Sequence, residues 1–375
     1  MAELPLKGLR VIELARILAG PWAGQTLADL GAEVIKIESK TGDDTRTWGP
    51  PFINTGEETN AAYYHSCNRG KQSVSLDFKD KNDLLKLKNL IASADILIEN
   101  FKVGGLDKYG LDYKTLHNNH PSLIYCSITG FGQTGPYAKR AGYDFLMQGM
   151  SGLMSITGEA DSQPQKVGVA VTDIFTGLYA VIAVQAALRS RDTTGLGQHI
   201  DLSLLDVATA TTANQAMNYL TTGTPPNRRG NNHPNIVPYC AVSTCDGYII
   251  LAVGNDEQFK NFNKIFDVEW YRKDKFKTNP ARLENRDELL NLIEGKTINF
   301  SSADLLIECE NFGVPAGPIN TLEDVFNDPQ ILHRGMKIDL DGVPSVKNPI
   351  IFSDMEMSYD SPSPNLGDSN KKFLK

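Results

Sequence analysis

The stretch from Val169 to Leu188, VAVTDIFTGLYAVIAVQAAL, limits the fold of this chain more than any other. After Asp173 every side chain to Leu188 is apolar, small or uncharged, which predicts a helix that is buried on most of its circumference. At the first turn of this helix, the Asp173 carboxylate is expected to accept free backbone N–H groups and to stay ionised. Asp173 is therefore either a helix cap or a nucleophile toward an activated carbonyl.

Before this stretch, strand-like and helix-like runs alternate. The strand-like runs cover residues 9–14, 32–38, 73–78, 96–99 and 123–129, and the helix-like runs cover 21–30 and 83–93. The alternation predicts an α/β fold with a Rossmann-like, mostly parallel sheet that binds ligands at the carboxyl ends of its strands. The turn after the first strand has Gly20 and Gly24 in place of GxGxxG, and GxxxxGK[ST] is absent from the chain. Neither a nicotinamide site nor an ATP site is indicated.

The chain of 375 residues is long enough for two domains. Residues 221–235 are rich in Pro, Gly and Asn, which is typical of a linker. We therefore expect a large domain over residues 1–220, a linker over 221–235, and a smaller α+β domain over 236–313. The small domain would open on a hairpin around Asp246 and Gly247, and residues 314–375 would return to complete the large domain.

The composition excludes several classes of protein. The five cysteines are scattered without a CxxC pair or a Cys/His cluster, which argues for a reduced cytoplasmic protein and against a metal centre. The N-terminus lacks the pattern of a signal peptide, and no unbroken apolar run is long enough to predict a membrane span. The net charge of -8 argues against a nucleic-acid partner.

Cationic residues recur in four loops that are expected at the same sheet edge, within residues 42–52, 68–73, 99–110 and 129–144. One such loop would be an ordinary solvated loop, but four together favour a site for a phosphorylated ligand. The cations are Arg46, Arg69, Lys71, Lys102, Lys108, Lys139 and Arg140.

Five motifs together resemble the class III coenzyme A transferases, the formyl-CoA and carnitine-CoA transferase group. They are LARILAGPWAGQTLADLGAEVIKIE, TGFGQTGP, AGYD, TGLGQHIDLSLLD and VPAGPI, and the likeness covers essentially the whole chain. It implies an interlocked homodimer, with the two chains threaded through each other. It also implies that acyl-CoA and small carboxylic acids are the ligands, with CoA as substrate and product and no tightly bound cofactor.

In that family the nucleophile is an aspartate that opens a buried helix about thirty residues after the Tyr of AGYD, and Asp173 follows Tyr143 in this way. The resemblance implies a mixed anhydride and then an aspartyl-CoA thioester on Asp173. Exchange of one thioester for another is nearly isoenergetic, so this chemistry needs no ATP, metal or catalytic cysteine.

The resemblance also assigns residues to the CoA channel. After KIE the formyl-CoA branch has an Arg, whereas this chain has Ser39 and Lys40, so Lys40 is the candidate to replace that contact. The LGxHT pattern of the family is LGDSN here (366–370), which leaves that helix cap open. The implied channel residues are Leu18, Ala19, Lys40, Asn68, Arg69, Lys71, Asn100, Phe101, Lys102, Lys108 and Tyr143.

For the substrate, GDDTRTWGPPF, SITGFGQTGP and NHPNIVPY look most like the succinyl-CoA:dicarboxylate branch. A short dicarboxylate needs a cation for its distal carboxylate, and Arg46 is the candidate. A phosphate contact or a loop salt bridge is the alternative for Arg46. The loop from Gly230 to Pro234 is a candidate shield for the intermediate, in which His233 either contacts substrate or is only a polar loop residue.

Two other functions stay open. The α-methylacyl-CoA racemases share this resemblance, but they use a histidine where this chain has Tyr143, and a tyrosine is a poor base for proton abstraction. A non-catalytic acyl-CoA-binding paralogue is the second alternative, and the presence of Asp173 argues against it.

Overall fold

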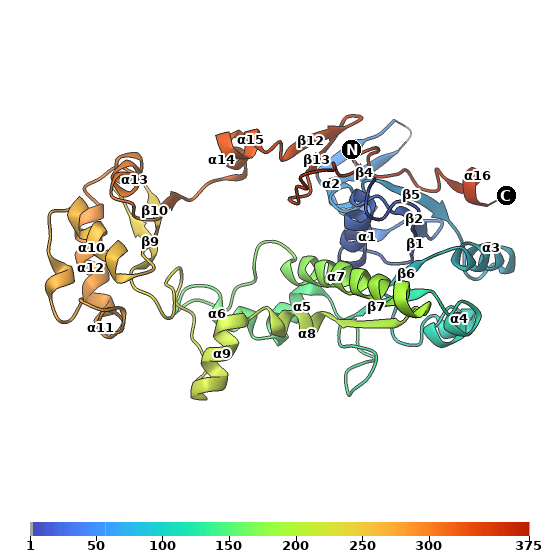
Figure 1. The fold of residues 1–375 in the computed structure, drawn as a ribbon, viewed down its shortest axis with the longest axis horizontal. Coiled ribbons are helices and arrows are strands. Elements are labelled where there is room, and N and C mark those ends of the chain that lie inside the picture. Colours follow the sequence, from blue (N-terminus) through green and yellow to red (C-terminus); the bar gives the residue numbers. More distant parts are fainter. Residues whose placement is uncertain (1–2, 57, 375) are drawn as a thin grey trace. The chain divides into compact units, whose positions relative to one another are not determined.

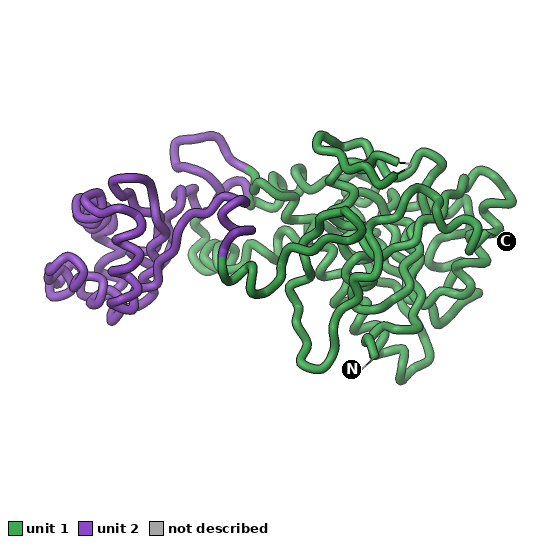
Figure 2. The backbone as a smooth tube through the Cα atoms, turned by 90° about the horizontal axis from the view of Figure 1, so that it is seen from above, with its two compact units in different colours: residues 1–153, 166–224, 329–375 green, residues 154–165, 225–328 purple. Residues whose placement is uncertain are grey.

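The computed structural model describes residues 3–56 and 58–374, which form two compact units (Figure 2). The larger unit contains the chain up to Leu153, together with Lys166–Thr224 and Pro329–Lys375. The smaller unit contains Met154–Gln165 and Pro225–Asp328. The first major boundary, after Thr224, falls inside the predicted linker.

A six-stranded parallel sheet forms the centre of the larger unit, in the order β5-β2-β1-β6-β7-β8 (Figure 1). This is the strand order of a Rossmann sheet. Successive strands are added on one side of β1 up to β5 and on the other side from β6 onward, so the order changes direction between β1 and β6. The predicted parallel sheet is therefore confirmed. The strands are β1 (Arg10–Glu13), β2 (Glu33–Glu38), β5 (Lys71–Ser75), β6 (Ile96–Glu99), β7 (Ile124–Thr129) and β8 (His199–Ser203).

Helices cover both faces of this sheet, because its central strands are buried on both sides and rich in Ile, Val and Leu. One face packs against α1 (Ala19–Asp29) and α7 (Val171–Thr194). The other face packs against α3 (Lys81–Ala92) and α4 (Tyr113–Asn119). The Asp80 carboxylate caps α3 by accepting the N–H groups of Asn82 and Asp83, and Asp112 caps α4.

Helix α7 packs closely on α1 at Gly177, where a Cβ atom would lie 2.7 Å from the Ala19 carbonyl oxygen. The opposite face of α7 is exposed, so the expected burial on most of the circumference is wrong for the single chain. The exposed apolar side chains are Phe175, Leu178, Tyr179 and Ile182. By length and composition alone α7 could cross a membrane, but half of its most apolar window is buried inside the structure, as in the core helix of a globular unit.

Short elements and the C-terminal tail complete the larger unit. The tail returns to the sheet, where Ser369 donates its N–H to the Ser73 carbonyl. The other elements are η1 (Asp44–Thr47), β3 (Phe52–Asn54), β4 (Thr59–Ala61), α2 (Ala62–His65), η2 (Asp107–Tyr109), α5 (Asp144–Met150), α6 (Leu153–Ile156, at the boundary between the units), α8 (Leu204–Ala210), α9 (Ala213–Thr222), α15 (Pro329–His333), β12 (Lys337–Leu340), β13 (Val343–Val346) and α16 (Asn370–Phe373).

The smaller unit is a three-stranded antiparallel sheet with helices packed around a separate apolar core. The predicted hairpin forms its centre, and Thr321 and Asp324 form a capping box at the start of the helix over Leu322–Asn327. Residues 314–319, expected in the return segment, instead contribute the third strand of this sheet, so the second boundary lies after Asp328. The elements are β9 (Tyr239–Ser243), β10 (Tyr248–Ala252), α10 (Asp256–Ile265), η3 (Trp270–Arg272), α11 (Asn279–Glu284), α12 (Arg286–Thr297), α13 (Ser302–Asn311), β11 (Ala316–Pro318) and α14 (Leu322–Asn327).

Candidate active site

A cavity of about 410 Å³ opens at the carboxyl ends of β1, β6 and β7, where the strand order reverses. This is the position at which open α/β sheets bind ligands. Its walls come from residues 16–19 after β1, from the loop after β6, from residues 128–130, and from residues 138–143. Asp173, at the third position of α7, also lines it.

The Asp173 carboxylate is buried and unpaired. Asp173 is 9% exposed, and no side chain or backbone N–H among the described residues donates to its carboxylate or pairs with it. Burial, and then the negative charge of Asp144, raise the pKa of Asp173 to about 7. The expectation that Asp173 accepts free N–H groups, which would keep it ionised, is therefore wrong.

The cap of α7 is Asp144 instead. This residue opens α5, and its Oδ1 accepts the N–H of Thr172 at 2.8 Å and that of Asp173 at 3.4 Å. Its Oδ2 accepts a hydrogen bond from Gln148 Nε2 at 2.7 Å. One carboxylate thus satisfies the helix terminus and fixes it beside α5, which leaves the neighbouring Asp173 carboxylate free. No local sequence pattern predicts this cap, because Asp144 precedes the helix by almost thirty residues.

Six of the expected channel residues line the cavity together with Asp173. They are Leu18, Ala19, Asn100, Phe101, Lys102 and Tyr143. Asn100 joins two walls, because its Oδ1 accepts the Arg16 N–H at 2.9 Å and its Nδ2 donates to the Arg16 carbonyl at 2.7 Å.

Two further cations line the same cavity, and neither was assigned to it individually from the sequence. Arg16 pairs with Asp44 at 3.0 Å in an exposed position. The Arg140 guanidinium lies 4.6 Å from the Tyr137 ring centroid and 5.4 Å from that of Phe131, and no carboxylate among the described residues pairs with it.

A family model described as CoA-transferase family III matches residues 6–370. The chain belongs to CoA-transferase family III. The succinate–glutarate CoA-transferase of Agrobacterium fabrum is 54% identical to it, over 99% of this chain and 95% of that protein. Human succinyl-CoA:glutarate CoA-transferase is 43% identical, over 99% of this chain and 85% of that protein. The crystal structure of a CAIB/BAIF family protein from Brucella suis is 57% identical and superimposes with a TM-score of 0.91, over 100% of this chain and 99% of that one.

In this transferase, three of the other five expected channel residues are engaged in the interior. Lys71 Nζ is buried 2.8 Å from each of Glu13 Oε2, the Pro21 carbonyl and Asn68 Oδ1. Arg69 forms two hydrogen bonds to Asp29, at 2.9 and 2.6 Å. These contacts are ion pairs and hydrogen bonds of the interior, so the assignment of Asn68, Arg69 and Lys71 to CoA is not supported by their placement.

The remaining two lysines of that set lie at the surface of the transferase. Lys40 pairs with Asp83 at 3.1 Å and donates to the Ser75 carbonyl at 3.0 Å. Lys108 lies over the ring of Tyr109, 4.9 Å from its centroid. Neither residue lines the cavity.

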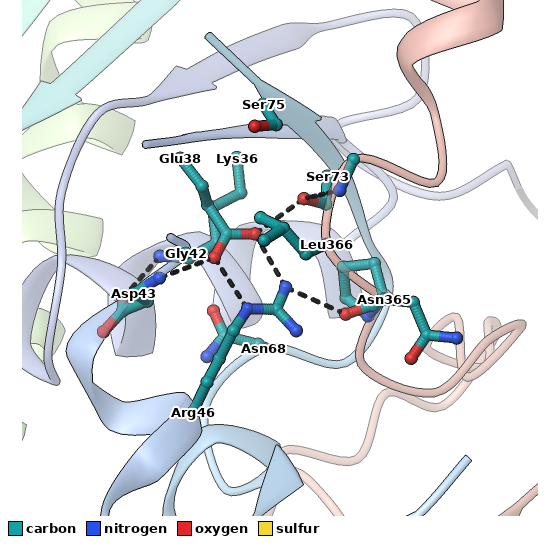
Figure 3. A network of polar contacts seen from close by, with 12 residues as sticks. Lys36, Glu38, Gly42, Asp43, Arg46, Asn68, Ser73, Ser75, Asn365 and Leu366 are labelled. Carbon is teal, nitrogen blue, oxygen red and sulfur yellow. Dashed lines mark hydrogen bonds and ion pairs between the residues drawn. The ribbon is translucent and has the colours of Figure 1, made fainter. Parts of the chain in front are cut away.

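Arg46 requires a correction, since its guanidinium is buried in an ion-pair network rather than in the cavity (Figure 3). Its Nε and Nη2 donate to Glu38 at 2.9 and 2.8 Å. Nη2 also donates to Tyr64 Oη and the Pro364 carbonyl, and Nη1 donates to Asn60. With these donors occupied, Arg46 cannot also bind a substrate carboxylate, and the alternative of a loop salt bridge holds.

His233 belongs to the smaller unit. Its Nδ1 accepts the N–H of Asn235 at 3.1 Å, and its ring lies 5.2 Å from that of Tyr239. Burial lowers the pKa of His233 below its ordinary value, so the ring is neutral at neutral pH. Contact of His233 with substrate stays a prediction.

Proposed function

We propose that this chain transfers CoA from succinyl-CoA to a short dicarboxylate such as glutarate, with Asp173 as the covalent nucleophile. The observation that carries the proposal is the unpaired, buried Asp173 carboxylate on the wall of the cavity. The relatives at 54% and 43% identity, which are named for succinate or succinyl-CoA and glutarate, support this choice of acids.

The reaction needs only atoms that the substrates and Asp173 supply. An oxygen of Asp173 attacks the thioester carbonyl, the C–S bond breaks, and CoA leaves as a thiolate. The thiolate then attacks the aspartyl carbonyl of the mixed anhydride, which releases the first acid and forms an aspartyl-CoA thioester. The acceptor carboxylate reverses these two steps, so that the new acyl-CoA leaves and Asp173 is again a free carboxylate.

The surroundings of Asp173 favour this role. A carboxylate that accepts several hydrogen bonds is a weak nucleophile because each donor stabilises its charge, and the cap contacts of Asp144 spare Asp173 from that. Its pKa of about 7 leaves much of it ionised at neutral pH. Such a group is both reactive and available.

The cations of the cavity are Arg16, Lys102 and Arg140 among the described residues. We assign them to the phosphates of CoA and to the distal carboxylate of the acid, because guanidinium and ammonium groups form charge-assisted hydrogen bonds with both. They take over the role for which Arg46 was the candidate.

A homodimer with interlocked chains is part of the proposal. The exposed apolar face of α7 and the exposed side chains of Ile350 and Ile351 support it, since apolar surface of this extent is characteristic of an interface. A reducing cytoplasmic compartment is also proposed, because the five cysteines are all free thiols.

The two alternative functions fit the site less well. A racemase needs a base on each side of the carbon that loses its proton, and the described residues that line the cavity include no histidine. A binding paralogue would have no use for a buried carboxylate without a partner, because such a group costs stability.

Replacement of Asp173 tests the proposal directly. Asp173→Ala is expected to lower kcat for succinyl-CoA and glutarate by at least about a thousandfold, because the covalent route is removed while the cavity stays intact. The matched control is Asp192→Ala, an exposed carboxylate on the same helix, which should retain normal turnover. Hydroxylamine should attack the aspartyl-CoA thioester in the wild type, release CoA and leave a hydroxamate on Asp173, and no such product should form in Asp173→Ala. Near-normal turnover of Asp173→Ala would contradict the proposal.

A further inference from the structure

The loop after β6, residues 100–105, is a thin wall between two cavities of the larger unit. One side lines the active-site cavity, and the other lines a second cavity of about 240 Å³. Lys102, Val103 and Gly105 line both. A wall bordered by cavities on two sides has few packing contacts, so its shape depends on the hydrogen bonds that hold it.

Two sets of hydrogen bonds hold the start of this loop. The first is the pair between Asn100 and the Arg16 backbone. The second is made by Glu99, whose Oε2 accepts the Phe101 N–H at 2.8 Å. Glu99 is 5% exposed, and the nearby Ser127 hydroxyl lowers the pKa of its carboxyl. No cation pairs with Glu99 among the described residues.

Ser127 connects Glu99 to a histidine. Its Oγ lies 2.9 Å from His199 Nε2, and the His199 ring stacks on Tyr113 with centroids 4.6 Å apart. Ser127 lies between Glu99 and His199, whereas in a hydrolytic triad the histidine lies between the serine and the carboxylate. The arrangement is therefore suited to hold the Glu99 carboxylate and not to activate Ser127 as a nucleophile.

Glu99 titrates in the neutral range. Burial raises its pKa to about 7, with a further contribution from the negative charge of Asp201 on β8, while the Ser127 and Phe101 hydrogen bonds oppose the shift. Burial also keeps the pKa of His199 below its ordinary value. The other charged or titratable groups on this side line the second cavity, and they are Lys102, Asp107, Asp112, Tyr113, Lys114 and Tyr125.

We propose that Glu99 is a positioning residue for CoA, whose ionised carboxylate holds the loop of residues 100–105 in the shape that binds CoA. A hydrogen bond to an ionised acceptor is about twice as strong as one to a neutral acceptor, so protonation loosens the loop. The inference rests on the proposed function only in taking CoA as the ligand. CoA affinity should therefore fall as the pH falls through about 7.

Calorimetric titration of CoA into the full-length enzyme between pH 6 and pH 8.5 tests this. In the wild type, Kd should rise about three- to tenfold toward low pH. In Glu99→Gln the side chain is neutral throughout, so CoA binding should be weak at pH 8.5, and the ratio of the variant Kd to the wild-type Kd should fall toward low pH. Titration of the CoA phosphates affects both proteins equally and cancels in their ratio. The control is Asp107→Asn, a carboxylate of the same second cavity, which should leave the pH dependence unchanged.

A second variant separates this role from a merely structural one. Ser127→Ala removes the hydroxyl that lowers the pKa of Glu99, so the midpoint of the pH dependence should move to higher pH. A simple packing defect would lower the affinity for CoA at every pH without moving the midpoint of its pH dependence. The proposal is wrong if Glu99→Gln binds CoA like the wild type at pH 8.5, or if the Ser127→Ala midpoint stays in place.

If circular dichroism shows that Glu99→Gln is unfolded, the proposal is tested by the midpoint of the pH dependence in Ser127→Ala. These are binding measurements, so they are independent of turnover. Failure of the covalent mechanism would instead be seen as retained activity of Asp173→Ala.

Discussion

Two aspartate carboxylates lie near the start of α7, and they differ in the hydrogen bonds that they accept. Asp144 accepts hydrogen bonds from the Thr172 and Asp173 N–H groups and from Gln148. Asp173 accepts none from the described residues, and its pKa is raised to about 7 by burial and by the charge of Asp144. One residue therefore organises the helix terminus, and the other is left available for chemistry.

This division predicts a pH profile. In the proposed mechanism ionised Asp173 is the nucleophile, so kcat/KM should rise with pH and level off above about 7. Asp144→Asn keeps an oxygen that can accept the Thr172 N–H but removes the negative charge, so the pKa of Asp173 should fall and the profile should move to lower pH. Initial rates from pH 5 to pH 9 measure this shift, and an unmoved profile would show that the charge of Asp144 does not act on Asp173.

For single residues, sequence motifs predicted the wall of the cavity better than the positions of cationic residues did. Leu18 and Tyr143, taken from the turn after β1 and from AGYD, line the cavity, as does Asn100 of the loop after β6. Arg46 and Arg69 were misplaced because a sequence shows a cation without its partner. Their carboxylates, Glu38 and Asp29, become neighbours only when the sheet and α1 form.

Among the elements, the contact between α1 and α7 sets the position of Asp173. Gly177 lies against the α1 backbone four residues after Asp173, and any side chain there would have to push the helices apart. The same contact supports Ala19, which lines the cavity. Helix packing and the geometry of the site are thus coupled.

Gly177→Val should therefore destabilise the fold by about 1 to 3 kcal/mol, the usual cost of overpacking, and lower turnover as Asp173 moves. Urea unfolding and steady-state kinetics measure the two effects. Ala186→Val, at an exposed position of the same helix, adds the same side chain without the clash. It lowers helix propensity whereas Gly177→Val raises it, so propensity cannot explain a larger loss of stability in Gly177→Val. Equal stability of the two variants would show that α7 can shift at no cost.

The sequence predicted the existence and course of α7 but not its surroundings. An uncharged helix implies that its surface is covered, yet the pattern cannot say whether the same chain or another covers it. In this structure α1 and the sheet cover one face, and Phe175, Leu178, Tyr179 and Ile182 lie exposed on the other.

For the whole molecule, strand alternation was enough to predict the parallel sheet, and Pro-rich and Gly-rich composition located the first boundary. The second boundary was missed because β11 has only three residues. Its assignment depends on pairing with β10, which no local pattern reveals.

The proposed dimer predicts that sedimentation at micromolar concentration gives twice the mass of 41.2 kDa. Ile182→Asp places a charge on the exposed face of α7 and should dissociate or misassemble the dimer. Leu85→Asp, at an exposed position of α3, should leave the assembly unchanged. A wild-type monomer at this concentration would overturn the proposal.

Burial without a partner favours the reactivity of the Asp173 carboxylate, but it also lowers the stability of the folded chain. Its pKa of about 7 in the folded chain exceeds the ordinary value of 3.8, so between these pH values the folded state holds a proton that the unfolded chain releases. The contribution of Asp173 to stability therefore falls as pH rises through this window, and the full penalty applies above it. A neutral residue at this position would avoid that penalty, so the carboxylate that we propose as the nucleophile carries a cost in stability.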